Sequence, residues 1–400
     1  MRRALGCIAA AAAAVLTLSL SPPSAAAETP APDTEATTQP APTAAAALPE
    51  EPDANFVEQC QNDPESNSEQ GRVWNRGVWC QHTTSYGEIV TNGSVSRADI
   101  TYTALAYADP ADRKVRVFFQ VDDFDTSGGV INSFTDMRIS LGCQAARDVT
   151  GNDDGDKNNW LLTWRDLTGF VSWDITSQDQ GLGAERVARH RWNFSGQLVT
   201  TSGQATISGV GLDHHIRCDS AGTAPGYGGW TPRACVNDDV MPYITYSKSG
   251  PAAGVAQHLE TALNRPVETY PNRGTPKTIP GKYTGVWGDP GLHRVAVGSP
   301  EYVANRTEQR KIRDRNAPYN GPDDLPPKPS PDVQADEFPF ASTREGLGAK
   351  DAQGNIIGNG SVAWVNAQQN IAAGNQLKDF YKNDRILMGD QDEFYVNIVP

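Results

Sequence analysis

The chain has 400 residues and a formal net charge of −14, with 34 lysine and arginine residues against 48 aspartate and glutamate residues. This length allows about two domains. The negative balance excludes a protein that binds nucleic acid through its whole surface.

Residues 1–27 have the three parts of a secretory signal peptide. Arg2 and Arg3 supply the positive charge, Ala9–Leu20 is apolar, and small residues lead up to a predicted cleavage site after Ala27. The apolar run is shorter than the roughly 20 residues of a spanning helix, which argues against the alternative of a membrane anchor. No later segment is apolar enough to span a bilayer. We therefore expect a secreted, extracellular protein without a stable membrane anchor.

Two segments of different character come after the signal. Residues 28–55 are rich in alanine, proline and threonine, without hydrophobic periodicity, and are typical of a disordered linker. Residues 56–250 contain several stretches in which apolar and polar residues alternate, as Val115, Val117 and Phe119 do. Alternation with period two, bounded by turn residues, predicts strands with one buried face. We expect an all-β, sandwich-like domain here.

Five cysteines remain after signal cleavage, and an oxidising compartment favours their pairing. The short-loop choices are Cys60 with Cys80 and Cys218 with Cys235, which leaves Cys143 over. The spacing of the cysteines and histidines does not match a zinc site.

The segment at residues 251–284 combines a helix with a connecting linker. Val255, Leu259 and Leu263 recur at helical spacing, which predicts a helix over residues 251–264. Residues 266–282 are rich in proline and glycine, as expected for a connection.

Residues 285–400 alternate between ordered and extended stretches. We predict a polar, basic helix at Tyr302–Arg315 and a proline-rich extended loop at Asn316–Ala335. A strand at Ser361–Asn366, a helix at Ala367–Tyr381 and a final strand at Phe394–Val399 complete the chain.

Basic residues concentrate between Arg273 and Arg315, where nine lysines and arginines stand against four acids. A local basic strip can attract a polyanion even in an acidic protein. The alternative is a solvated helix face without a ligand.

The most informative stretch is Asp336–Gly346, with the sequence DEFPFASTREG. Asp336, Glu337 and Glu345 supply carboxylates, and Arg344 lies among them. Hydrolysis of a phosphodiester requires a base that activates water and positive charge at the phosphate. Carboxylate and amide oxygens suit Mg²⁺ or Mn²⁺, and arginine suits phosphate.

This stretch resembles the DE-aromatic-proline signature of the NucA/NucB deoxyribonuclease family. GSVAWVNAQQNIAAGNQLKDFY, NDRILMGDQDEFYVNIV and the upstream HRVAVGSPEYVANRTEQRKIRDRN resemble the rest of that domain, over about residues 285–400. The resemblance implies a small α+β (strand–strand–helix) nuclease domain after the all-β domain. Many relatives have a cysteine directly before the DE pair, whereas this chain has Ala335 and no cysteine after Cys235.

By resemblance, four residues match positions expected at the active site: Asp336, Glu337, Glu345 and Asn370. We expect Asp336 or Glu337 to activate water, and Asn370 with a carboxylate such as Glu345 to hold Mg²⁺ or Mn²⁺. Phosphate contacts are expected from four basic residues: Arg344, Arg310, Lys311 and Arg313. No histidine occurs after His293, so a carboxylate has to be the base unless His293 reaches in from outside.

The sequence therefore predicts a secreted, metal-dependent endonuclease that hydrolyses DNA. Two alternatives remain open at this stage. One is a surface- or ligand-binding protein whose nuclease-like domain is inactive, and the other is a delivered toxin nuclease. The partner of the β-domain is not identified by its sequence.

Overall fold

The computed structural model describes residues 48–145, 155–208, 212–272 and 276–400. The predicted signal peptide and most of the predicted linker lie outside these residues. Among the described residues, no helix is both long and apolar enough to cross a membrane.

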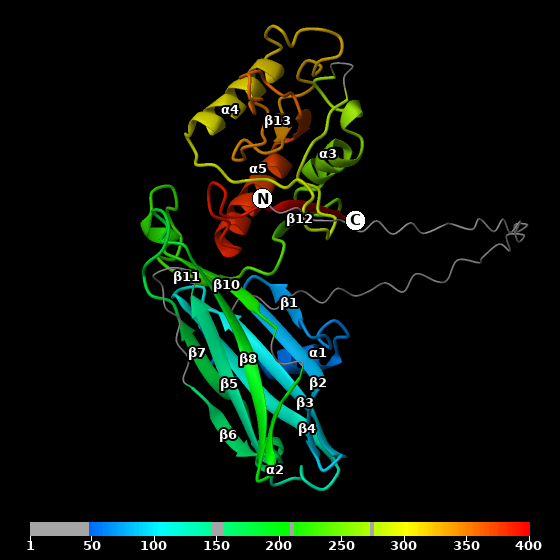
Figure 1. The fold of residues 1–400 in the computed structure, drawn as a ribbon. Coiled ribbons are helices and arrows are strands. Elements are labelled where there is room, and N and C mark those ends of the chain that lie inside the picture. Colours follow the sequence, from blue (N-terminus) through cyan, green and yellow to red (C-terminus); the bar gives the residue numbers. More distant parts are fainter. Residues whose placement is uncertain (1–47, 146–154, 209–211, 273–275) are drawn as a thin grey trace, which may run out of the picture. The chain divides into compact units, whose positions relative to one another are not determined.

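A β-sandwich of two antiparallel sheets forms the first part of the described chain, and Figure 1 shows the sheets as two layers. The first sheet has the order β1-β2-β3-β4-β7, with bounds Arg72–Asn75, Val78–Thr91, Ser94–Ala108, Lys114–Ser127 and Val171–Thr176. The second has the order β11-β10-β8-β5-β6, with bounds Ala234–Asn237, His214–Asp219, Ala188–Thr200, Asp136–Ala145 and Lys157–Trp160; β9 (Gly203–Thr206) pairs with β8. The expected all-β sandwich is confirmed.

Apolar side chains that alternate along the strands fill the space between the two sheets. Val115, Val117 and Phe119 on β4 are buried in this core, as the period-two pattern predicts. Four tryptophans are buried with them: Trp79, Trp164, Trp173 and Trp192. Three short helical segments belong to this part: α1 (Ala54–Asn62), α2 (Leu161–Asp166) and the 3₁₀ turn η1 (Ala221–Thr223).

Both predicted disulfides are present. Cys60–Cys80 joins α1 to β2, and Cys218–Cys235 joins the paired strands β10 and β11. Cys143 lies on β5 and takes part in neither.

A second, smaller α+β core forms the C-terminal part. Its elements are β12 (Tyr243–Ser247), α3 (Ala253–Asn264), η2 (Pro266–Glu268), α4 (Pro300–Arg313), β13 (Val333–Phe338), β14 (Ser361–Asn366), α5 (Ala367–Asn383) and β15 (Tyr395–Val399). β13 pairs with β14 antiparallel, and β12 pairs with β15 parallel. The predicted helices and strands of this part are present, with small shifts at their ends. β13 was not predicted, and its first three residues belong to the stretch expected to be an extended loop, Asn316–Ala335.

Two elements that precede residue 285 belong to this C-terminal core. β12 is hydrogen-bonded to β15, the last strand of the chain. α3 buries Val255 and Leu259 in the same cluster as Phe338 of β13 and Phe380 of α5. Both elements therefore pack with the strands and helices that follow residue 285.

The pair β13–β14 and the helix α5 together position the polar residues of this part. Asp336 on β13 lies opposite Ala363 on β14. The chain passes directly from β14 into α5, and Asn366 caps the helix by accepting hydrogen bonds from the backbone N–H groups of Gln368 and Gln369. This strand-to-helix step brings Asn370 close to β13.

Candidate active site

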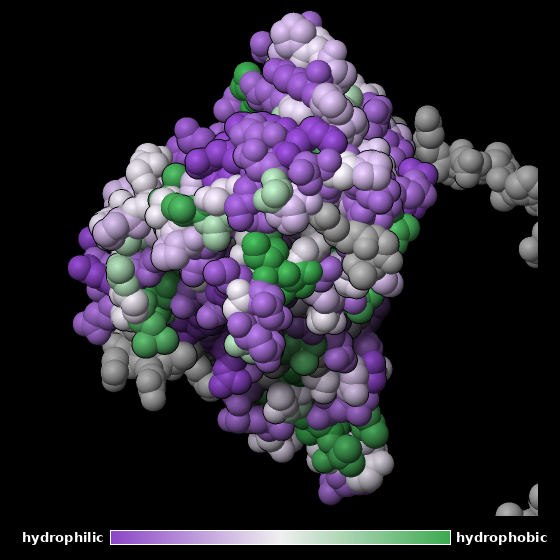
Figure 2. Space-filling view, turned by 90° about the horizontal axis from the view of Figure 1, so that it is seen from above, coloured by the Kyte–Doolittle hydropathy of each residue, from purple (hydrophilic) through white to green (hydrophobic). Residues whose placement is uncertain are grey.

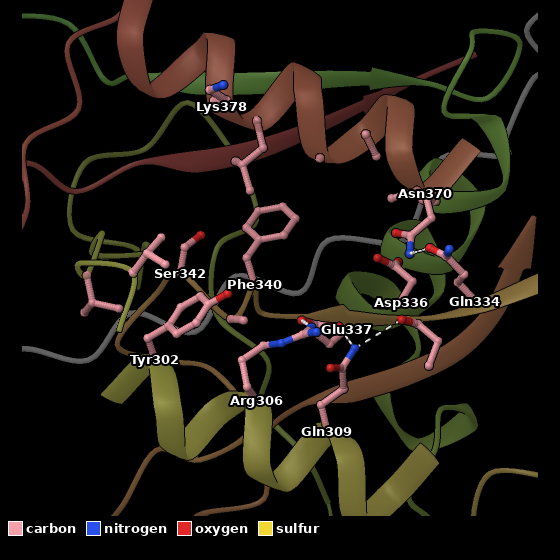
Figure 3. A pocket seen from close by; sticks show the side chains of 18 of the residues that line it. Tyr302, Arg306, Gln309, Gln334, Asp336, Glu337, Phe340, Ser342, Asn370 and Lys378 are labelled. Carbon is pink, nitrogen blue, oxygen red and sulfur yellow. Dashed lines mark hydrogen bonds and ion pairs between the residues drawn. The ribbon is translucent and has the colours of Figure 1, made fainter. Parts of the chain in front are cut away.

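A cavity of about 1010 Å³ lies over β13, between α4 and α5. Its lining includes Asp336 and Glu337 of β13, Arg306 of α4 and Asn370 of α5 (Figure 3). Three of the four residues predicted for catalysis thus meet at one cavity. The fourth, Glu345, is not part of its lining.

Glu337 reaches α4 on one side of the strand. Arg306 donates from Nη1 to Glu337 Oε1 at 2.9 Å, and Gln309 donates from Nε2 to Glu337 Oε2. The side chain is largely buried. Burial raises the pKa of Glu337 from 4.5 to about 7, and the charge of Arg306 opposes this only in part. The carboxyl group therefore exchanges a proton near neutral pH.

Asp336 reaches α3 instead, because successive side chains of a strand point to opposite faces. Its Oδ2 lies 2.6 Å from Nδ1 of His258, and Nε2 of His258 lies 2.7 Å from the hydroxyl of Ser361. The structure records no hydrogen bond from a described residue to Asp336 Oδ1. His258 thus fixes the Oδ2 atom of Asp336, and Asp336 also belongs to the cavity lining.

Asn370 stands next to Asp336 in Figure 3. Its amide nitrogen donates to Oε1 of Gln334 at 3.2 Å, so its oxygen is the atom that remains for a ligand. Two carboxylates and two amides at one cavity are hard oxygen donors of the kind that Mg²⁺ and Mn²⁺ prefer. Among the described residues, no group of three or more His, Cys, Asp or Glu side chains is arranged to hold a metal by itself. A bound ion would therefore need Asn370 and water or substrate oxygens as further ligands.

The lining of the cavity is more basic than the chain as a whole. It contains five basic residues: Arg294, Arg306, Arg313, Lys328 and Lys378. Three acids oppose them: Asp314, Asp336 and Glu337. A positive lining in a protein of net charge −14 favours an anionic ligand at this place.

The sandwich part of the chain also contributes to the cavity. Gly226, Gly228 and Trp230, between η1 and β11, belong to the lining. The guanidinium of Arg294 lies 4.9 Å from the ring centre of Trp230, and an equal distance from that of Tyr381 on α5. These stacked groups form one wall of the cavity.

Glu345 and Arg344 do not belong to this lining. Glu345 accepts hydrogen bonds from the backbone N–H and the ring Nδ1 of His293, each at 2.9 Å, and this contact raises the pKa of His293. Arg344 pairs with Asp390 at 2.6 Å.

The four predicted phosphate-binding residues are thus divided. Arg313 lines the cavity. Arg310 is exposed at the helix surface, and Lys311 pairs with Glu308. With Arg344 they lie outside the lining, so the basic strip of α4 is only partly directed at the cavity.

His258 is the residue that sequence reasoning missed. It lies on a helix upstream of the stretch that resembles the nuclease family, and only histidines at or after position 293 were considered as candidates for the base. One signal was present, because His258 comes three residues after Val255 and therefore shares its buried helix face. A histidine on an otherwise apolar face needs a polar partner, which here is Asp336.

Comparison with known proteins confirms the resemblance for the C-terminal part. Residues 292–397 match the sequence model of the family described as Deoxyribonuclease NucA/NucB. The match includes β13, β14 and α5, and hence Asp336, Glu337 and Asn370. It leaves out α3 with His258 and the segment with Trp230. No curated protein and no solved structure matches the chain.

Proposed function

We propose that this NucA/NucB-type C-terminal part makes the protein a metal-dependent endonuclease that hydrolyses phosphodiester bonds of DNA. The observation that carries the proposal is the meeting of Asp336, Glu337 and Asn370 with Arg306 at one cation-lined cavity. All four residues lie within the segment that matches the deoxyribonuclease family.

Asp336 is the residue we assign to the activation of water. Its Oδ2 is occupied by His258, and its Oδ1 is left to accept a proton from a water molecule in the cavity. A carboxylate held in one orientation is suited to this role, because a general base has to meet the proton within hydrogen-bond distance.

Glu337 and Arg306 are assigned to the phosphate. The ion pair with Glu337 holds the Arg306 side chain at the cavity wall, and the guanidinium retains further N–H donors for phosphate oxygens. Arg313, Lys328 and Lys378 add positive charge around the path of the nucleic acid. Figure 2 shows a face of the molecule that is mostly hydrophilic, with small, separated apolar patches.

The amide oxygen of Asn370 would hold Mg²⁺ or Mn²⁺, with water and substrate oxygens as the further ligands. When bound, such an ion stabilises the negative charge that develops on the phosphate and its leaving oxygen. Glu345, the other metal ligand expected from the sequence, lies beside His293 and remains outside this assignment.

We also propose that the protein acts outside the cell. Two disulfides support export, because such bonds persist in oxidising compartments. Sequencing the N-terminus of the protein recovered from culture medium tests this, with a new N-terminus at Glu28 as the expected result.

Digestion of plasmid DNA by the purified mature chain tests the proposed activity. Cleavage is expected with Mg²⁺ or Mn²⁺ and is expected to stop in EDTA. Asp336→Asn is expected to reduce the rate about 10²–10⁴-fold while DNA binding is retained. Asp332→Asn, the same change at an exposed position before β13, is the matched control and is expected to cleave normally.

Two results would count against the proposal. Activity of Asp336→Asn at the wild-type rate would remove Asp336 from the site. A folded wild-type chain that binds DNA but does not cleave it with any divalent ion would favour the binding-protein alternative.

A further inference from the structure

A buried chain of three polar side chains extends from the cavity into α3. His258 is only 4% exposed in its side chain, and both of its ring nitrogens have a partner: Asp336 at 2.6 Å and Ser361 at 2.7 Å. Ser361, at the start of β14, is fully buried. The imidazole is therefore fixed between two strands that are themselves paired.

This arrangement restricts the carboxylate of Asp336. Rotation about the last side-chain bond of an aspartate is broad when nothing holds it. The contact from His258 to Oδ2 selects one orientation, and Ser361 in turn selects the orientation of the imidazole. Oδ1 is the oxygen that this contact leaves available on a residue that lines the cavity.

Neither His258, the partner of Asp336, nor Ser361, the partner of His258, can act on a substrate directly. His258 and Ser361 do not belong to the cavity lining, and the hydroxyl of Ser361 is shielded from solvent. A histidine general base and a serine nucleophile are both incompatible with this burial. Any effect of His258 on catalysis has to pass through Asp336.

We propose that His258 is a positioning residue for Asp336, and that the working site of this nuclease therefore extends to α3, outside the segment that matches the family. The inference rests on the proposed function, since it assigns a role to a neighbour of the proposed base. It goes beyond that function by adding a residue and an element to the site.

Steady-state cleavage by single variants of the full mature chain tests this inference. His258→Leu fills the volume but removes both contacts, and is expected to lower kcat about 10–100-fold with little change in the KM for DNA. His258→Asn keeps an N–H near the position of Nδ1 and is expected to recover most of that loss. Ser361→Ala removes only the outer contact and is expected to cause a smaller loss than His258→Leu.

A double-mutant cycle separates positioning from a structural role. If His258 acts through Asp336, the variant with both His258→Leu and Asp336→Asn is expected to cleave no more slowly than Asp336→Asn alone. Mn²⁺ affinity, measured by electron paramagnetic resonance, supplies a readout independent of activity, and circular dichroism reports folding. His214→Leu, at a buried histidine of the sandwich, is the control and is expected to leave kcat unchanged.

The possible outcomes are distinct. Additive losses in the double variant would overturn the positioning role, as would a folded His258→Leu with wild-type kcat. Equal loss in His258→Asn and His258→Leu would also overturn it, because the donor would then be irrelevant. If His258→Leu does not fold, His258→Asn and Ser361→Ala decide the question. Absence of cleavage by the wild-type chain would instead reject the proposed function.

Discussion

The β-sandwich and the C-terminal core are stabilised by different means. The sandwich has an apolar interior with four buried tryptophans and both disulfides of the described chain. The C-terminal core has neither disulfide. Both regions bury titratable groups, such as Arg113 and Asp219 in the sandwich and Asp336 and Glu308 in the C-terminal core. Their burial lowers stability unless each has a partner. In the C-terminal core, two carboxylates of β13 also line a cavity together with basic residues.

Backbone pairing and α4 together hold the strand that carries Asp336 and Glu337. Ala335 lies on β13 opposite Trp364 of β14, and its carbonyl accepts a hydrogen bond from Gln309 at 3.1 Å. The carboxylate segment is thus held by backbone pairing on one side and by α4 on the other.

The two regions share a buried ion cluster around Asp392. Its carboxylate accepts hydrogen bonds from Arg217 of β10 and from Arg76, the latter at 2.8 Å. Burial works to raise the pKa of Asp392, but the two arginines outweigh it and lower that pKa to about 2. This stabilising contribution is present above the ordinary pKa of 3.8 and is lost as the pH falls through about 2.

The largest predicted effect on stability comes from Asp392→Asn. Arg217 and Arg76 would each lose one carboxylate partner and keep another, Asp219 and Asp238 respectively. The loss should therefore stay at or below the roughly 3–5 kcal/mol of a broken buried ion pair. Urea unfolding at pH 7 measures the loss, and we expect both regions to become less stable. Asp390→Asn, at a carboxylate whose side chain is 81% exposed, should change the free energy of unfolding by less than about 0.5 kcal/mol. Equal effects of the two variants would contradict the role given to the cluster.

Replacement of Cys60 and Cys80 by alanine is predicted to act on the sandwich alone. The bond closes a loop with a sequence separation of 20 residues, and its loss should lower the free energy of unfolding by about 3 kcal/mol. The kcat of the folded variant is expected to remain that of the wild type. A loss of cleavage at a temperature where the variant stays folded would show that the disulfide of the sandwich also affects the candidate active site.

Glu337→Gln is predicted to stabilise the C-terminal core in a pH-dependent way. The folded-state pKa of Glu337 lies near 7 against an ordinary 4.5, so ionisation of this residue lowers stability progressively as the pH rises from about 4.5 to 7. Glutamine removes this cost. We expect a gain of about 2–3 kcal/mol at pH 8 and of less than about 1 kcal/mol at pH 5.

Thermal unfolding of Glu337→Gln at both pH values measures the difference, together with the cleavage rate, which is expected to fall. A gain of the same size at pH 5 would indicate a packing effect instead of a titration effect.

The smallest predicted effect concerns the salt dependence of DNA binding. Arg313 and Arg310 both lie on α4, but only Arg313 lines the cavity. Arg313→Ala is expected to reduce the slope of log affinity against log salt concentration by about 1, and Lys378→Ala likewise, while Arg310→Ala leaves it unchanged. Fluorescence anisotropy in EDTA at several salt concentrations measures these slopes. Identical slopes for the Arg310 and Arg313 variants would indicate that the basic residues of α4 form a solvated helix face that does not contact DNA.

Much of the local structure was predictable from the sequence alone. The alternation around Val115 identified β4, and the predicted strand Ser361–Asn366 coincides with β14. These signals are local, because the spacing of apolar residues depends on the periodicity of one element. The two disulfides were also predictable, since cysteines close in the chain meet at a low entropic cost. Asp336, Glu337 and Asn370 line one cavity, because a single strand–strand–helix unit contains them.

Only the tertiary structure decided which residues from distant parts of the chain lie beside Asp336, Glu337 and Asn370. His258 and Asp336 are 78 positions apart, and β12 pairs with β15 across most of the C-terminal part. Glu345 belongs to the same short motif as Asp336, yet the turns after β13 direct it to His293. Contacts of this kind depend on how helices and strands pack against one another, and side-chain periodicity within a single element does not contain that information.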